Sequence, residues 1–434
     1  MKQIIFALWA GFMLIALPLR AEVDIQEITT PDGHSAWLVE DHTIPFMSLN
    51  LAFKGGASLD APGKRGATSL MMALLEEGTG DMDARAFASA VDALAASFSY
   101  DARDDAVTIS ARMLSENRGE ALKLLRGALV KPRFDQSAID RVRKQVVSII
   151  QSSQKDPSDI AMTAFDAATF GDHPYATSSD GTVDSVTALT RDDIQDAYKG
   201  AIATDRVYIS AVGDITAAEL TQLIDDLLRD LPATGAPMPQ QAQLEMAPGI
   251  FVTPFDTPQS VAVFGHSGIK RDDPDFFAAF VANTIFGGGG FNSRLMDEVR
   301  EKRGLTYGIY SYIGIKDHAE IIAGQFSSAN DRIADAIDVV KDEWRRFAEE
   351  GVTQEELDEA KTYLTGAYPL RFDGNGPIAN ILVGMQMDDL PTSYIATRND
   401  KVNAVTLEDI NRVIKRLYRP DALHFTVVGQ PAGL

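Results

Sequence analysis

Arg300 and Tyr307 are the two side chains whose types and spacing could do chemistry in the second half of the chain. They follow a run of four glycines at residues 287–290. The sequence predicts that Arg300 lies on a helix that Asn292 caps and Gly304 ends, and that Tyr307 opens the strand after it. Across such a helix-to-strand corner, the planar fork of a guanidinium and the hydroxyl of a phenol could both be aimed at one place.

These residues also have interpretations without chemistry. Arg300 could bond to the carbonyl groups of its own helix, and Tyr307 could be a core aromatic residue of a strand that places Tyr307, Ile309 and Ser311 on one face. The four glycines could suggest a phosphate cradle, but no Gly-Lys-Ser/Thr follows them and the chain is strongly acidic. The residue types alone therefore leave both a binding role and a structural role open for the pair.

Side chains that could bind a metal ion are few and scattered. The chain has no cysteine, which excludes disulfides, thiolate metal sites and cysteine nucleophiles. No two of the six histidines have the i, i+3 or i, i+4 spacing of ligands on one helical face; they are His34, His42, His173, His266, His318 and His424. We therefore assign no histidine as a metal ligand.

The elements that must position these residues form two similar halves. Residues 186–213 align with residues 402–429 without a gap, so that Thr190 matches Thr406. In each copy the threonine can cap a helix that has aspartate in its first turn, and an alternating strand pattern follows. The sequence therefore predicts an α+β fold of two homologous domains, each a mainly antiparallel sheet packed with helices.

Patterns of both kinds are spread along the chain. Strand patterns occupy residues 48–53, 106–112, 260–265 and 306–315. Helical patterns occupy residues 67–77, 84–95, 116–129, 136–154, 275–285, 331–349 and 353–364. The expected boundaries are a signal peptide at 1–21, an N-terminal domain at 22–232, a proline-containing linker at 233–248 and a C-terminal domain at 249–434.

Residues 1–21 have the pattern of a secretory signal peptide, with Lys2, an apolar run and a small residue, Ala21, before the cleavage point. The alternative is an uncleaved anchor, because the uncharged stretch reaches the lower end of the transmembrane range, about 17 residues. Export without cysteine is compatible with a bacterial periplasm. We expect a periplasmic protein that is not inserted in the membrane after signal cleavage.

Composition excludes several other classes of protein. With 45% hydrophobic and 24% charged residues over 434 positions, the chain has the composition of an ordinary globular protein. Its 62 acidic and 40 basic residues give a net charge of −22, which should repel phosphate backbones. We therefore expect no nucleic-acid partner.

The helix predicted near residues 66–79 resembles the N-terminal signature of the M16 family of zinc peptidases, to which mitochondrial processing peptidase and pitrilysin belong. Active members carry His-x-x-Glu-His here, with two zinc-binding histidines and a glutamate that acts as general base. The matching positions in this chain are Ser69, Met72 and Ala73, none of which can ligate zinc usefully or take up a proton. The family's third zinc ligand, a glutamate, would fall near residues 145–150, where no acid is present.

The segment from the four glycines to Tyr307 resembles the C-terminal-domain signature of bacterial M16 peptidases. In active members, an arginine and a tyrosine seven residues apart grip the substrate's backbone carbonyl and help to stabilise the tetrahedral oxyanion. The resemblance assigns this substrate-binding role to Arg300 and Tyr307. It runs from Val23 to Gly429 and implies an M16 fold that forms half of a clam shell.

The resemblance also implies a function and partners. In some M16 peptidases one subunit holds zinc and the other keeps the Arg/Tyr pair. This chain fits the second role, with no cofactor of its own, zinc in a catalytic subunit carrying His-x-x-Glu-His, and unstructured peptides as ligands. One rival interpretation is a stand-alone peptide-binding or scaffolding protein. Another is an active metallopeptidase with an unrecognised site, which zinc content and hydrolysis by the lone chain would reveal.

Overall fold

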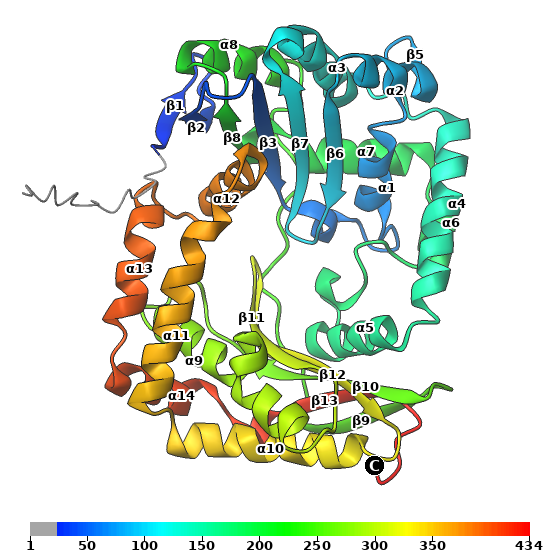
Figure 1. Cartoon of the computed structure of the whole chain (residues 1–434). Coiled ribbons are helices and arrows are strands. Elements are labelled where there is room, and N and C mark those ends of the chain that lie inside the picture. The colour runs from blue at the N-terminus through cyan, green and yellow to red at the C-terminus, as the bar shows by residue number, and fades with distance from the viewer. Residues whose placement is uncertain (1–23) are drawn as a thin grey trace, which may run out of the picture.

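The computed structural model describes residues 24–434 of the chain (Figure 1). The predicted signal peptide at residues 1–21 lies outside the described residues. Of the helices within 24–434, none combines the length and the apolar character that a membrane span needs.

Two mixed β-sheets form the framework of the fold. The first has the order β1 (Gln26–Thr29), β2 (Ser35–Glu40), β8 (Val207–Gly213), β3 (Phe46–Lys54), β7 (Ala106–Leu114) and β6 (Ser97–Ala102). The second has the order β9 (Gly249–Pro254), β13 (His424–Gly429), β10 (Gln259–Ser267), β12 (Ala319–Ala329) and β11 (Ile309–Lys316). A separate small ladder joins β4 (Gly78–Thr79) and β5 (Met82–Asp83).

Apart from β1, the two sheets correspond strand for strand. The pairs β2–β8 and β9–β13 are parallel, and the remaining neighbours in both sheets are antiparallel. The repeat in the sequence is therefore also a repeat of topology. This confirms the predicted α+β fold built on two sheets packed with helices.

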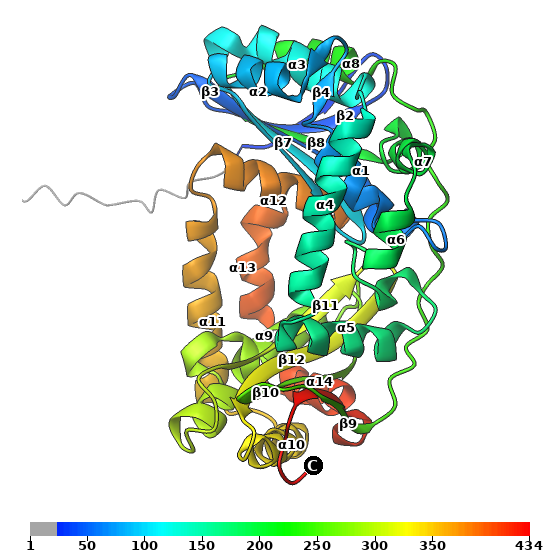
Figure 2. The same ribbon diagram turned by 90° about the vertical axis from the view of Figure 1, so that its right-hand side faces the viewer.

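Helices surround both sheets (Figures 1 and 2). They are α1 (Ala67–Leu74), α2 (Ala84–Ala93), α3 (Arg118–Val130), α4 (Gln136–Ser153), α5 (Pro157–Phe170), α6 (Val183–Ala188), α7 (Arg191–Ala201), α8 (Ala217–Leu228), α9 (Phe276–Asn283), α10 (Ile333–Glu350), α11 (Gln354–Ala367), α12 (Asn375–Met387), α13 (Tyr394–Ala404) and α14 (Leu407–Leu417). The predicted threonine caps are confirmed: Thr190 accepts from the Asp193 backbone N–H at the start of α7, and Thr406 from that of Asp409 at the start of α14.

One helix of each half packs on the sheet of the other half (Figures 1 and 2). α5 covers β10 and β13, where Phe165 is fully buried in one cluster with Val263. α12 covers β3 and β8, where Leu382 is fully buried in one cluster with Val212. Burial of such large side chains stabilises a fold by about 1.5–3 kcal/mol each. The two halves are therefore joined by apolar cores as well as by the chain.

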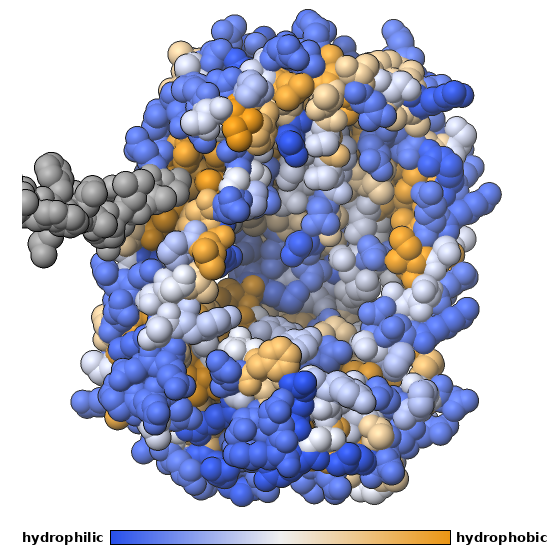
Figure 3. All heavy atoms as spheres, in the orientation of Figure 1, coloured by the Kyte–Doolittle hydropathy of each residue, from blue (hydrophilic) through white to orange (hydrophobic). Residues whose placement is uncertain are grey.

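Long helices also bridge the halves and leave a hollow between them. α4 runs along one side of the molecule, and α11 and α13 run along the other (Figure 1). The space-filling view shows a deep recess between the two halves (Figure 3). The molecule therefore offers a concave face bounded by both sheets.

Two expectations near Tyr307 are wrong. The strand predicted at 306–315 begins at Ile309, so Tyr307 lies in the preceding loop and does not share a strand face with Ser311. The Thr306 hydroxyl, which donates to the Ser327 carbonyl at 2.7 Å, fixes this loop before strand pairing begins. The expected cap Asn292 instead lies in a tight turn that closes before Ser293.

The predicted linker contains no helix or strand. Regular structure is absent from residues 229–248, between the end of α8 and the start of β9. The strands of the first sheet precede this segment and those of the second follow it. The boundaries proposed for the domains, at residues 232 and 249, stay predictions.

Candidate functional site

The three positions that match the family's zinc motif lie on α1. The Ser69 hydroxyl donates to the Ser179 carbonyl at 2.8 Å, so it serves a neighbouring loop. Met72 is only 1% exposed and belongs to the core of the first sheet, and Ala73 packs against the same core. A hydroxyl, a buried thioether and a methyl group are not a donor set that fits zinc.

The start of α1 is held by a carboxylate instead. Asp60 accepts hydrogen bonds from the backbone N–H groups of Gly66, at 2.8 Å, and Thr68, at 2.9 Å. Burial raises the pKa of Asp60, and the hydrogen bonds from Thr68 oppose that shift. This acid therefore orders the helix.

α4 supplies no replacement ligand. The region expected to hold the third ligand falls in α4, and its Ile149 is 56% exposed. Within residues 24–434, no group of three or more His, Cys, Asp or Glu side chains is placed to hold a metal ion. The part of the chain described by the structure thus has no metal-binding cluster.

Arg300 lies at the end of the helix that follows the glycine run, in the π-helical segment Met296–Glu301. Its guanidinium lies 4.7 Å from the centre of the Phe291 ring, and its Nη1 donates to the Glu301 carboxylate at 2.7 Å. About a third of the side chain, 32%, is exposed. Arg300 thus pairs with an acidic side chain and does not bond to the carbonyl groups of its own helix, as the structural alternative expected.

Tyr307 projects from an anchored loop. Its residue is 89% exposed, which contradicts the alternative of a core aromatic. The backbone on either side is held: the Ser328 hydroxyl donates to the Leu305 carbonyl at 2.6 Å, and the Gly308 N–H donates to the Thr306 hydroxyl at 3.1 Å. An exposed phenol on a fixed backbone suits contact with a partner or ligand.

The structure brings Arg300 and Tyr307 to the same corner but records no hydrogen bond between them in the described residues. Gly304 ends the intervening helix as predicted, with a positive φ of 57° and an N–H bond to the Arg300 carbonyl. Both side chains therefore have donors left for another molecule. Their role in binding stays a prediction.

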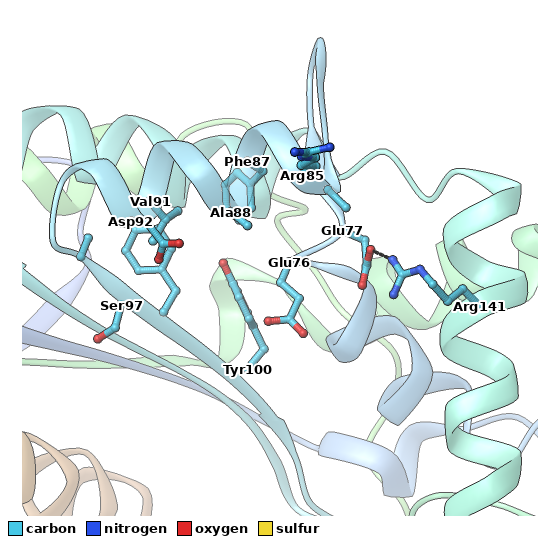
Figure 4. Close-up of a pocket in the computed structure, with 13 residues that line it drawn as sticks. Glu76, Glu77, Arg85, Phe87, Ala88, Val91, Asp92, Ser97, Tyr100 and Arg141 are labelled. Carbon is cyan, nitrogen blue, oxygen red and sulfur yellow. Dashed lines mark hydrogen bonds and ion pairs between the residues drawn. The ribbon is translucent and has the colours of Figure 1, made fainter.

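A pocket of about 510 Å³ beside α1 was not predicted from the sequence. Figure 4 shows Glu76 and Glu77, which follow α1, facing α2, β6 and α4, and Glu77 forms an ion pair with Arg141. Burial raises the pKa of Glu76, with a smaller contribution from repulsion by Glu77. The Tyr100 hydroxyl is buried here and has no hydrogen-bond partner among residues 24–434. These groups lie far apart in the sequence, so no spacing pattern could reveal the pocket.

Charged groups also gather where the two halves meet. The Asp104 carboxylate accepts from Arg65 Nη2 at 2.7 Å and from Lys316 Nζ at 2.6 Å, and so links the β6–β7 turn to the end of β11. Burial raises the pKa of Asp166 on α5 to about 7; Lys316 opposes the shift and Asp104 adds to it. The junction therefore contains an acid that titrates near neutral pH.

Comparison with known proteins identifies the family. Residues 36–182 match the family model described as insulinase (peptidase family M16), and residues 188–364 match the one described as peptidase M16 inactive domain. A crystal structure of a peptidase M16 inactive domain from Pseudomonas fluorescens is 30% identical, with a TM-score of 0.88 over 94% of this chain and 98% of that one.

Relatives similar in sequence include one named as a non-peptidase and one named as a zinc protease. The non-peptidase homolog YmxG of Helicobacter pylori is 26% identical over 99% of this chain and 98% of its own. The uncharacterized zinc protease SCO5738 of Streptomyces coelicolor is 27% identical over 82% of this chain and 81% of its own. The chain belongs to the M16 peptidase family.

Proposed function

We propose that this chain is the non-catalytic subunit of a heterodimeric periplasmic zinc peptidase. In this role it supplies Arg300 and Tyr307 to peptide held at the zinc site of a catalytic partner that carries His-x-x-Glu-His. The observation that carries the proposal is a contrast: Met72, at the position of the general base, is 1% exposed, whereas Tyr307 is 89% exposed. A scaffold without ligands has no need to retain the Arg/Tyr pair of the family's motif.

The chemistry of the pair supports this role. Arginine offers five N–H donors in a planar fork, and within residues 24–434 Arg300 pairs with one carboxylate, that of Glu301. Tyr307 can add an O–H donor. Donors fixed before the substrate arrives stabilise the negative charge that develops on a peptide carbonyl during hydrolysis, because little reorganisation is needed. The recess between the two halves gives room for an unstructured peptide (Figure 3).

Two further points support a non-peptidase role in an exported compartment. The Helicobacter pylori relative is named a non-peptidase homolog, and it spans nearly the whole of this chain. The first 21 residues have the pattern of a cleaved signal peptide, and the chain has no cysteine. We therefore place the heterodimer in the periplasm.

The test is cleavage of unstructured peptides by this chain alone, by a catalytic M16 subunit from the same organism alone, and by both together. We expect hydrolysis only with both subunits. Arg300→Ala should then lower kcat by about tenfold to a thousandfold, the effect of losing one oxyanion-type donor, while the subunits still associate.

Arg303→Ala is the matched control, since Arg303 lies three residues away and pairs with Glu298. It should leave kcat within about twofold, because rim charges contribute little. Equal turnover with Arg300→Ala would make Arg300 structural. Failure of this chain to stimulate any partner would favour a stand-alone peptide-binding or scaffolding protein, and zinc-dependent hydrolysis by the lone chain would refute the proposal.

A further inference from the structure

A second pocket, of about 430 Å³, lies in the C-terminal half. Its walls come from α9, α12, α13 and the turn Tyr368–Arg371. Three arginines and one aspartate line it: Arg271, Arg371, Arg398 and Asp388. This excess of positive charge is opposite to the chain as a whole, in which acidic residues outnumber basic ones by 62 to 40.

Arg398 is the most deeply buried of the three, at 6% exposed. Its Nη1 donates to the Leu364 carbonyl at 2.8 Å and to Asn399 Oδ1 at 3.0 Å, and its guanidinium lies 4.6 Å from the centre of the Tyr368 ring. In the described part of the chain, no carboxylate lies within 4.0 Å of it. A buried charge without an opposite charge is costly, so an anion near Arg398 would be stabilising.

Arg271 and Arg371 leave donors free as well. Arg271 stacks on Phe276, 4.2 Å from the ring centre, and donates to the Tyr394 hydroxyl at 2.8 Å. The Asp388 carboxylate, 4.0 Å from its Nε, is the one acidic group paired with it in the part of the chain that the structure describes. Arg371 is exposed and has no carboxylate within 4.0 Å among residues 24–434. The pocket can therefore accept an anion at its mouth. The negative charge of that anion would compensate the buried positive charge of Arg398.

The remaining walls are apolar rings. Phe277, Phe280 and Tyr368 line the pocket beside the arginines. A guanidinium fork matches the two oxygens of a carboxylate, and aromatic walls suit the apolar group next to it. We infer that this pocket binds a carboxylate of a peptide, with the neighbouring apolar side chain packed on the aromatic rings.

This inference deepens the proposed function and rests on it, because the choice of a peptide as the ligand comes from that function. The carboxylate could be the peptide's C-terminus or the side chain of an aspartate or glutamate. Because the pocket lies apart from Arg300 and Tyr307, it can be tested on the chain alone.

The experiment is fluorescence anisotropy with unstructured decapeptides labelled at the N-terminus and ending in leucine. The full mature chain should bind the free acid at least tenfold more tightly than the amide, because charge-assisted hydrogen bonds are lost in the amide. Amidated peptides with an internal glutamate or glutamine test the side-chain source; preference for glutamate assigns the site to side-chain carboxylates.

Arg371→Gln should weaken binding of the preferred peptide by about tenfold. Arg345→Gln, an exposed arginine paired with Asp342 on α10, should leave binding unchanged. Unfolding curves of both variants check that the fold is intact. Arg300→Ala is measured beside them: if the peptide sits in this pocket, Arg371→Gln weakens binding more than Arg300→Ala does.

Three results would overturn the inference. They are equal affinity for acid and amide with no preference for glutamate, equal losses in Arg371→Gln and Arg345→Gln, and no binding at millimolar peptide. If Arg300→Ala alone abolished binding, the peptide would sit at the Arg300 corner; the proposed function would then survive and this inference would fail. If no partner were stimulated but acid and amide differed, the reverse would hold.

Discussion

The zinc-motif helix of the first half and the Arg300 corner of the second half differ in what their key positions touch. Met72 on α1 packs in the core of the first sheet, and Ser69 bonds to a neighbouring loop. Tyr307 projects from a loop held on both sides, and Arg300 keeps donors in reserve. The first region is part of the framework of the fold, whereas the second leaves a guanidinium partly exposed and a phenol exposed.

Met72→Glu should give the largest effect, because it restores the family's acid inside an apolar core. We expect a loss of about 3–5 kcal/mol in the free energy of unfolding, since a buried carboxylate without a partner is costly. Urea unfolding of the mature chain measures it. Met72→Leu, which conserves volume, should cost less than about 1.5 kcal/mol.

A Met72→Glu chain as stable as the parent would contradict the assignment of this position to the core. It would mean that the helix still has room for a charged base. The zinc-motif helix would then no longer differ from the Arg300 corner as a purely structural region.

Asp166→Asn tests the junction between the two halves that carry these regions. The folded-state pKa of about 7 lies above the ordinary value of 3.8, so the folded chain binds this proton more tightly than the unfolded chain does. Stability from this group is therefore full below pH 4 and is lost as pH rises to 7. The asparagine cannot ionise, so the variant should be more stable than the parent at pH 8, by about 1–3 kcal/mol, and similar at pH 4.

Thermal unfolding between pH 4 and pH 8 checks this. Asp172→Asn, at an exposed position just after α5, should leave the pH dependence unchanged. Parallel stability curves for parent and Asp166→Asn would show that the carboxylate is ionised in the fold throughout this range.

Tyr307→Ala should have the smallest effect on stability and a clear effect on function. An exposed side chain contributes little, so the free energy of unfolding should change by less than about 0.5 kcal/mol. With a catalytic partner, kcat should fall by about tenfold or more. A large loss of stability with unchanged kcat would reverse the comparison and make Tyr307 structural.

Much of the local structure could be predicted from the sequence, because it depends on nearby residues. The repeated threonine caps and the alternating strands at residues 207–213 and 424–429 are set by side chains within a few positions. The exposure of Tyr307 could not be predicted, since it alternates with Ile309 as a strand residue would. The hydrogen bond from the Thr306 hydroxyl to the Ser327 carbonyl holds this segment as a loop. No local sequence pattern predicts a bond between residues so far apart.

Contacts between distant segments were the other gap. The apolar faces of α5 and α12 indicate burial, but a period of 3.6 residues does not say which sheet covers them. The Glu77–Arg141 and Asp104–Lys316 ion pairs likewise join residues 64 and 212 positions apart. Ser69, Met72 and Ala73 could be identified from the motif alone, whereas the pocket beside them could not.

The packing of α5 on the second sheet and of α12 on the first has a consequence for assembly. If the two halves were separate polypeptides, they would form a domain-swapped dimer, because each would pack one helix on the sheet of the other. The segment at residues 229–248 acts as the tether that makes this exchange intramolecular. The docking of α5 and α12 on the opposite sheets therefore depends on the effective concentration that the tether length sets. It does not depend on the concentration of the protein.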